Sequence, residues 1–250
     1  MMELWELALL AVAGFASGWI NVLAGGGSLF TVPVMVFLGM PGPVANGTNR
    51  IAIIAQNITA VGEFRRKGFS DFRLSASLAL CASIGAVGGA LLGVELDGVW
   101  FERTVAIIMI AVMIIMALPA RKSAAPRDPK APAKNLLLGH LLFVGAGFYG
   151  GFIQIGVGFV MMPILYRVMG LDLVRVNMHK VFVAFVFSIV ALGVFAAKVE
   201  IAWFAGAALA IGNAIGGWVG AHTTMTKGER FIKRAVFVAL AGMAVKLLFF

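Results

Sequence analysis

Residues 21–33 read NVLAGGGSLFTVP and interrupt an apolar run that extends from near Leu4 to near Leu38. Gly25, Gly26 and Gly27 can adopt non-helical backbone conformations that other residues disfavour. The run that follows them, about residues 28–39, is too short to cross a bilayer comfortably. The stretch therefore predicts a helix that breaks within an apolar environment and resumes as a short half-helix.

The composition of the chain indicates that this environment is a lipid bilayer. Of the 250 residues, 61% are hydrophobic and 12% are charged, and the mean hydropathy is +1.00. Soluble domains carry about a quarter charged residues. The formal charge of +9 would suggest nucleic acid in a soluble protein, but here the cations gather in loops between apolar runs. We therefore expect no nucleic-acid partner.

Apolar runs of membrane-spanning length predict an all-α integral membrane protein. A spanning helix needs about 17–25 residues. We expect eight long helices and two short half-helices, the latter at about 28–39 and 159–170, each directly after a glycine break. The long helices are expected at about residues 4–24, 44–63, 74–95, 103–119, 135–156, 174–197, 199–221 and 231–250.

The chain divides near its midpoint into two similar halves. Residues 120–134 read ARKSAAPRDPKAPAK, a charged and proline-containing linker between a first repeat, 1–119, and a second, 135–250. Each repeat would hold about five helical segments. The segments that correspond are GFASGWINVLAGGGSLFTVPV (14–34) with GFYGGFIQIGVGFVMMPIL (147–165), TNRI (48–51) with MHKV (178–181), and Gly85, Gly89 and Gly93 with Gly212, Gly216 and Gly220. The glycines recur at a spacing that lets neighbouring helices approach closely.

The distribution of basic residues predicts the orientation of the two halves. Basic loops usually face the cytoplasm, and four basic loops fall on one side if each short segment returns the chain to the side it came from. The linker is then cytoplasmic, both termini are periplasmic, and the repeats are inverted, which is typical of secondary transporters. The basic residues concerned are Arg65, Arg66, Lys67, Arg73, Arg121, Lys122, Arg127, Lys130, Lys134, Arg167, Arg175, Lys227, Arg230, Lys233 and Arg234.

The glycine breaks are the first candidate site. Irregular backbone at membrane depth is tolerated where it is buried in protein or lines a wet cavity. Gly25, Gly26 and Gly27 would let the backbone approach a ligand, and Ser28 would cap the half-helix, whose N-terminus favours an anion. The counterpart in the second half is Gly156 with Gly158. The alternative is that these glycines only let helices pack or turn.

A polar cluster around two cations is the second candidate site. Arg50 and Lys180 occupy matching positions near the starts of long apolar helices, where a cation must reach the interface, pair or meet a ligand. Few acids lie nearby in sequence, which suits an anionic substrate. For the surrounding amides, a structural hydrogen bond between helices is the alternative. The polar residues expected to join the site are Asn21, Thr48, Asn49, Gln154, Asn177 and His179, with Gln56 and Asn57 as further amides.

The motifs GGGSLFTVP and ANGTNR, with their copies in the second half, resemble the sulfite exporter TauE/SafE family, also described as toluene sulfonate uptake permeases, over nearly the whole chain. The resemblance implies an inner-membrane carrier for small sulfur-containing anions such as sulfite, sulfonates or sulfoacetate-like compounds. Members often have Thr or Ser before the second basic residue, whereas this chain has MHK (178–180), which places a titratable His179 there.

The sequence therefore predicts an alternating-access carrier for a small anion, with a proton or a sodium ion as alternative coupling ions. An anion channel and a membrane-embedded enzyme are the competing interpretations. A channel needs a continuous lined pore. An enzyme would need a nucleophile with a base or a metal cluster, and the three histidines lie far apart in sequence without carboxylates at ligand spacing. We expect no enzymatic activity, no cofactor and no metal.

Overall fold

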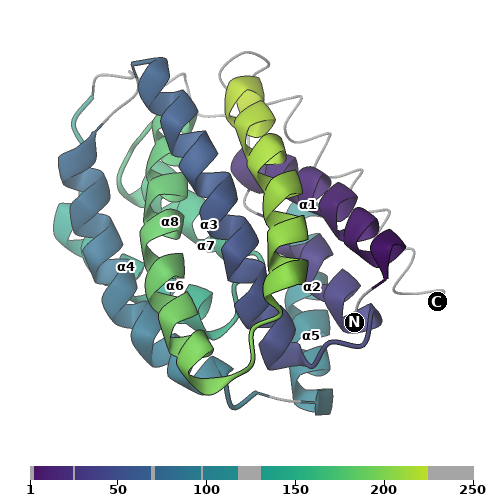
Figure 1. The fold of residues 1–250 in the computed structure, drawn as a ribbon. Coiled ribbons are helices and arrows are strands. Elements are labelled where there is room, and N and C mark those ends of the chain that lie inside the picture. The colour runs from purple at the N-terminus through teal and green to yellow at the C-terminus, as the bar shows by residue number, and fades with distance from the viewer. Residues whose placement is uncertain (1–2, 25, 69–70, 97, 118–130, 225–250) are drawn as a thin grey trace.

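The computed structural model describes residues 3–24, 26–68, 71–96, 98–117 and 131–224, and all regular structure within these ranges is helical (Figure 1). This confirms the all-α fold. Four helices are long and apolar enough to cross a membrane: Leu4–Leu23, Phe72–Gly93, Leu173–Lys198 and Trp203–Thr224. The labelled helices are α1 (Leu4–Ala24), α2 (Ser28–Phe37), α3 (Gly42–Arg66), α4 (Phe72–Gly93), α5 (Gly98–Ala117), α6 (Leu136–Phe152), α7 (Val157–Pro163) and α8 (Leu173–Lys198).

The predicted long helices agree with the structure to within a few residues at most ends, and the two short segments are present. The first is α2, and the second is α7 continued by a π-helical turn, η1 (Ile164–Val168). Pro163 precedes this turn and lacks the N–H that a regular helix would use, which accounts for the changed winding. The expected helix at 231–250, and residues 120–130 of the linker, lie outside the described residues.

Aspartates fix the starts of two long helices. The Asp71 carboxylate accepts from the backbone N–H of Leu74 at the start of α4. The Asp172 carboxylate accepts from the N–H groups of Val174 and Arg175 at the start of α8. These caps satisfy N–H groups that have no partner within the helix, so α4 and α8 begin at defined positions beside each other.

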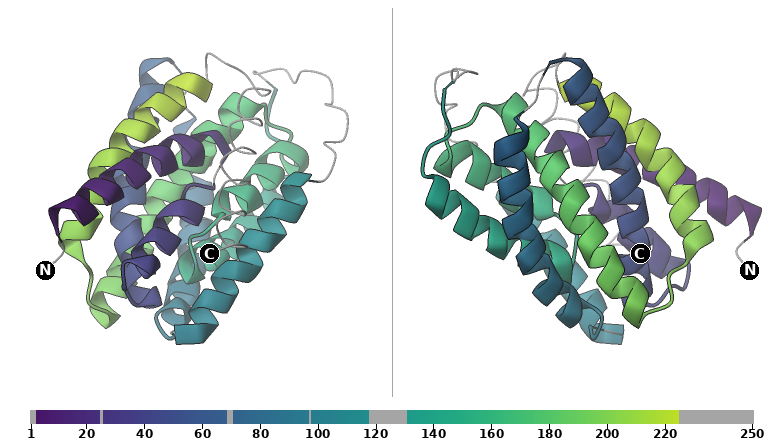
Figure 2. Two further views of the ribbon diagram at one scale, coloured as in Figure 1. Left: turned by 90° about the vertical axis from the view of Figure 1, so that its right-hand side faces the viewer. Right: turned by 60° about the vertical axis from the view of Figure 1, so that its left-hand side comes forward.

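Glycines bring two helix pairs into backbone contact. On α4, a Cβ added at Gly85, Gly89 or Gly93 would overlap backbone atoms of α6. On the helix Trp203–Thr224, a Cβ at Gly212 or Gly216 would overlap the backbone of α1 in the same way. The close approach predicted from the glycine spacing is confirmed for both helices. Figure 2 shows α1 lying across Trp203–Thr224.

The described basic loops meet at one end of the bundle. The guanidinium of Arg175 lies 3.4 Å from the Asp71 carboxylate, which brings the loop before α8 to the loop before α4. The backbone N–H of Lys134 donates to Met169 O, which brings the end of the linker to the same place. His222, near the end of Trp203–Thr224, lies 3.6 Å from Glu63 at the end of α3. This is the upper end in Figure 1.

Candidate functional site

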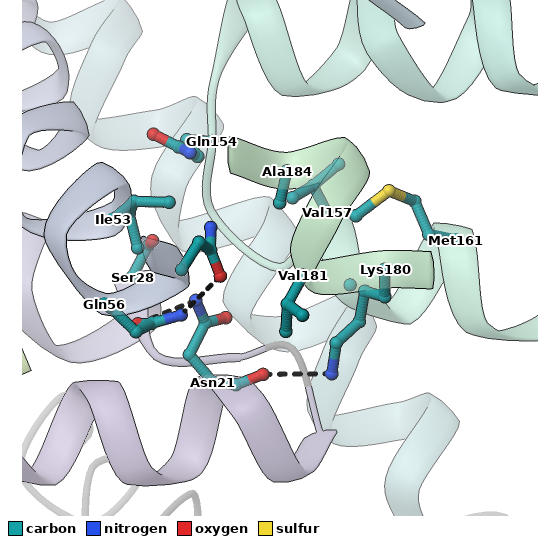
Figure 3. A pocket seen from close by; sticks show the side chains of 12 residues that line it. Asn21, Ser28, Ile53, Gln56, Gln154, Val157, Met161, Lys180, Val181 and Ala184 are labelled. Carbon is teal, nitrogen blue, oxygen red and sulfur yellow. Dashed lines mark hydrogen bonds between the residues drawn. The ribbon is translucent and has the colours of Figure 1, made fainter. Parts of the chain in front are cut away.

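A small buried cavity lies where the broken helices meet α3 and α8 (Figure 3). Both halves of the chain contribute to its wall, from α1, α2 and α3 on one side and from α7, α8 and the segment before α7 on the other. About 10 Å³ is open to a water-sized molecule, which is room for about one water. The lining residues are Asn21, Ser28, Ile53, Gln56, Asn57, Gln154, Val157, Gly158, Met161, Lys180, Val181 and Ala184.

A chain of amides forms one wall of this cavity. The backbone N–H of Gly27 donates to Asn21 Oδ1 (3.3 Å), and Asn21 Nδ2 donates to Gln56 Oε1 (3.1 Å). Gln56 Nε2 in turn donates to Asn57 Oδ1 (3.1 Å). The last group in this series of hydrogen-bonded amides is Asn57 Nδ2, a buried N–H₂ group with no hydrogen-bond partner among the described residues. An unpaired donor of this kind is costly to bury, so it is available to a ligand.

Lys180 supplies the positive charge of the cavity and is only 3% exposed. Its Nζ donates to Asn21 O (3.1 Å), Val22 O (2.8 Å) and Asn177 Oδ1 (2.7 Å). The two carbonyls belong to the last turn of α1, where a helix presents negative partial charge. Among the described residues, no carboxylate forms an ion pair with Lys180. Its charge is therefore balanced only by dipoles, and α8 is bound to the broken end of α1.

Arg50, in the first half of the chain, makes the equivalent contact with a broken helix of the second half. Its side chain is fully buried and donates to Gly150 O (3.0 Å) and Gly151 O (2.6 Å), at the broken end of α6. The guanidinium also lies over the ring of Phe195 on α8. Arg50 does not line the cavity, and its expected contact with a substrate stays a prediction. What the structure adds is that each cation binds the end of a broken helix in the other half.

Gln154, in the segment between α6 and α7, is the amide of the second half. Its Nε2 donates to Ser188 Oγ on α8 (2.6 Å), whereas its buried Oε1 has no hydrogen-bond partner within the part of the chain that the structure describes. Asn46 supports this segment, because its Nδ2 donates to Phe152 O (2.9 Å). Asn21 and Gln154, both predicted as amides of the site, line the same cavity.

The glycine break before α2 differs from the prediction. Gly27 has φ −57° and ψ −41°, which any residue can adopt, and a Cβ there would overlap Ser17 O. Position 27 therefore requires glycine because α1 packs against it. The expected cap by Ser28 is wrong, because Ser28 lies inside α2 and its hydroxyl instead accepts from Asn49 Nδ2 on α3 (3.0 Å). A Cβ at Gly26 would meet Phe159, and Gly25 lies outside the described residues.

The break before α7 has a left-handed residue at its centre. Gly156 has φ +71° at the start of α7, a conformation that favours glycine. Gly158 lines the cavity, whereas Gly156 does not. Gly27 and Gly156, which precede the two short helices, therefore differ in backbone conformation.

Three further predicted site residues do not line the cavity. Asn49 accepts from Thr31 Oγ1 (2.6 Å) and so holds α2 against α3. Thr48 Oγ1 accepts from the backbone N–H of Ala202, just before Trp203–Thr224. Asn177 accepts a hydrogen bond from Lys180, which lies on the same helix. The contacts of Asn49 and Thr48 are the structural alternative that the sequence left open for polar groups between helices.

The predicted His179 also lies away from the cavity, on the side of α8 that faces α4. Its Nδ1 is 2.8 Å from Ser75 Oγ, and its Nε2 is 3.9 Å from the Asp71 carboxylate.

The sequence did not single out the apolar part of the cavity wall. Helical spacing is the signal that could have found it, because Ile53, Gln56 and Asn57 share one face of α3.

The apolar helices and the buried polar cavity at two broken helices define a multi-pass α-helical membrane protein. The chain belongs to the sulfite exporter TauE/SafE family, whose sequence profile matches residues 10–247. No solved structure matches the chain.

Relatives from several bacteria match over almost their full length. A "Probable membrane transporter protein" of Haemophilus influenzae is 27% identical over 243 residues, covering 97% of this chain and 94% of the relative. "Probable membrane transporter protein ORF9" of Sinorhizobium is 28% identical, with 97% and 92% covered. "Probable membrane transporter protein YfcA" of Escherichia coli K12 is 25% identical, with 97% and 90% covered. Family and relatives together indicate a membrane transporter.

Proposed function

We propose that the protein is a secondary transporter that moves a small anion, a sulfur oxyanion or an organosulfonate, through the cavity beside Lys180. The observation that carries the proposal is a buried cation with no acidic partner in the described part of the chain, in a cavity that the two halves build together. A cation in this position is stabilised further when an anion joins it.

The cavity wall fits an anion that has one polar and one apolar end. Lys180 Nζ and the unpaired Asn57 Nδ2 are donors suited to oxyanion oxygens. Ile53, Val157 and Met161 present apolar surface to the same space. The family name points to sulfite, and the apolar wall extends the proposal to sulfonates with a small carbon group.

The reciprocal contacts of the two cations suggest how the site would open. Arg50 on α3 binds the end of α6, and Lys180 on α8 binds the end of α1. The observed cavity has room for about one water, so a sulfur oxyanion needs it to widen. We infer that the anion takes over donors of Lys180 and releases the end of α1, while Arg50 keeps α6 in place. Such exchange at the interface of two repeats is compatible with alternating access.

A transport assay separates this carrier from the alternative of an anion channel. We expect liposomes that contain the protein and unlabelled sulfite, sulfoacetate or toluenesulfonate to accumulate the same labelled anion transiently against its gradient. A carrier exchanges one bound anion for another, and its uptake saturates, whereas a channel gives neither effect. Empty liposomes and liposomes loaded with chloride are the controls. Uptake that rises linearly with concentration and shows no exchange would favour the channel.

The orientation in the inner membrane is proposed from the basic loops. Contacts bring the described basic loops to one end of the bundle, and basic loops favour the cytoplasm. We predict that the linker at 120–134 is cytoplasmic and that both termini are periplasmic. In a Cys81→Ser background, a cysteine placed at Ser123 should resist an impermeant thiol reagent in intact cells and react after permeabilisation. Labelling of that cysteine from outside would reverse the orientation.

A further inference from the structure

His179 and Lys180 are adjacent on α8 but serve different neighbours. Lys180 reaches the end of α1 and lines the cavity, whereas His179 is fully buried against α4. Its Nδ1 lies 2.8 Å from Ser75 Oγ, within hydrogen-bond distance. The proposed anion site therefore has a titratable ring directly behind it.

The second ring nitrogen of His179 has no hydrogen-bond partner among the described residues. Nε2 is buried and points toward the Asp71 carboxylate, at 3.9 Å from Oδ2. A neutral imidazole carries one N–H and one lone pair. If the N–H is on Nδ1 and donates to Ser75, the Nε2 lone pair faces the carboxylate, and two acceptors cannot form a hydrogen bond. The 3.9 Å separation agrees with this tautomer, and a proton on Nε2 would convert the contact into a charged hydrogen bond.

Charged groups of both signs lie around His179, and Asp71 is the one that favours an added proton. Asp71 faces it from the start of α4, and Arg175 lies on its own helix, 3.4 Å from the same carboxylate. Arg65 of α3 lines the small cavity beside Asp71. Lys180 points to α1 instead. The Asp71–Arg175 contact is long for a charged hydrogen bond, so the carboxylate can turn toward a second cation.

A path for the proton lies on the side of the basic loops. A second small cavity, with about 20 Å³ open to a water-sized molecule, is bounded by the ends of α3, α4 and α8. Both polar neighbours of His179, Asp71 and Ser75, line this cavity. His179 itself does not line this cavity, so a proton from water there would reach Nε2 past Asp71 or Ser75, without passing through the anion cavity.

We propose that His179, with Asp71 and Ser75, forms a proton-binding site that couples proton movement to anion movement in the same direction. The proposal rests on the transport function proposed above. In the step, a proton from water adds to the Nε2 lone pair, and the new N–H donates to the Asp71 carboxylate. The second positive charge beside Lys180 is unfavourable alone and is offset when an anion occupies the cavity. Proton and anion therefore favour each other's binding.

The test compares His179→Gln with His140→Gln in proteoliposomes. His140 is a matched control, because its ring also contacts a serine of α4, Ser77, but its Nδ1 has a partner as well, the Leu136 carbonyl. We expect an imposed inward proton gradient to accelerate anion uptake by the wild type and by His140→Gln, and to have no effect on His179→Gln. Anion exchange without a gradient should stay near the wild-type rate in His140→Gln and remain measurable in His179→Gln. Asp71→Asn should also lose the gradient effect while keeping the helix cap, since Asn caps as well as Asp.

Two outcomes would overturn the proton site: a gradient effect that survives in His179→Gln, or one that is lost equally in His140→Gln.

If the wild type moves no anion at all, the transport function fails, and a separate readout still decides the proton site. Spectra of ¹⁵N-histidine should show the ring signals of the three histidines, and the one missing in His179→Gln belongs to His179. That signal should change with pH in the wild type and respond differently to pH in Asp71→Asn. A His179 signal that changes neither with pH nor in Asp71→Asn would contradict the proposal.

Discussion

Gly89→Ala should prevent α4 from packing on α6 and leave little folded protein in detergent. A Cβ at this position would overlap the backbone carbonyl of Phe148 and approach the N–H of Phe152 within 2.7 Å. Backbone atoms cannot rotate away as a side chain can, so the two helices would have to separate along their whole contact. Overpacking in well-packed cores costs about 1–3 kcal/mol, and we expect a value at or above this range.

Gly88→Ala is the matched control for this prediction. A Cβ there would meet only the Phe148 ring, at 3.6 Å, which is ordinary contact. The melting temperature of purified Gly88→Ala should stay close to that of the wild type, or rise slightly because Ala favours the helix. Equal melting temperatures for Gly88→Ala and Gly89→Ala would mean that α4 and α6 are not in backbone contact.

Lys180→Gln should abolish most anion transport. Hydrogen bonds to charged groups contribute about 1.5–3 kcal/mol, and about 1.4 kcal/mol corresponds to a tenfold change in affinity. We therefore expect anion affinity to fall about tenfold or more. Glutamine retains one donor group for the α1 carbonyls, so the fold should be less affected than the affinity. The measurement is the concentration dependence of uptake in proteoliposomes.

Lys198→Gln provides the comparison for the loss of a cation from the same helix. Lys198 is exposed in the last turn of α8 and far along the helix from the cavity. Its transport should match that of the wild type. If Lys180→Gln and Lys198→Gln transport alike, Lys180 would serve only to hold α1, and Asn57 and Gln154 would remain as the polar groups of the site.

The helices and their breaks could be predicted from the sequence because they depend on local pattern. Apolar length, the glycine runs and Pro163 act within a few residues, and the helices lie close to where these features place them. Lys180, Asn21 and Gln154 could also be predicted as cavity residues, since a polar group at membrane depth needs a partner or a ligand.

The partners of the polar residues could not be predicted in the same way, because they depend on which helices meet. Arg50 binds carbonyls about a hundred residues away in the chain, and Thr48 binds the N–H of Ala202. Nothing in the local sequence distinguishes Asn49, which holds α2, from Asn57, whose Nδ2 is left unpaired in the cavity. The conformation of Gly27 likewise follows from its contact with α1 and not from the GGG motif.

The most direct test is the stabilisation that an anion gives to purified protein, measured for the wild type and for Lys180→Gln. Sulfite, sulfate, thiosulfate, sulfoacetate, taurine and toluenesulfonate would be compared at equal ionic strength. A ligand at 100 times its Kd stabilises a protein by about 2.7 kcal/mol. We predict that at least one sulfur anion raises the melting temperature of the wild type and of Lys198→Gln, and that this rise is lost in Lys180→Gln. An equal rise in Lys180→Gln, or no rise in the wild type with any of these anions, would contradict an anion site at Lys180.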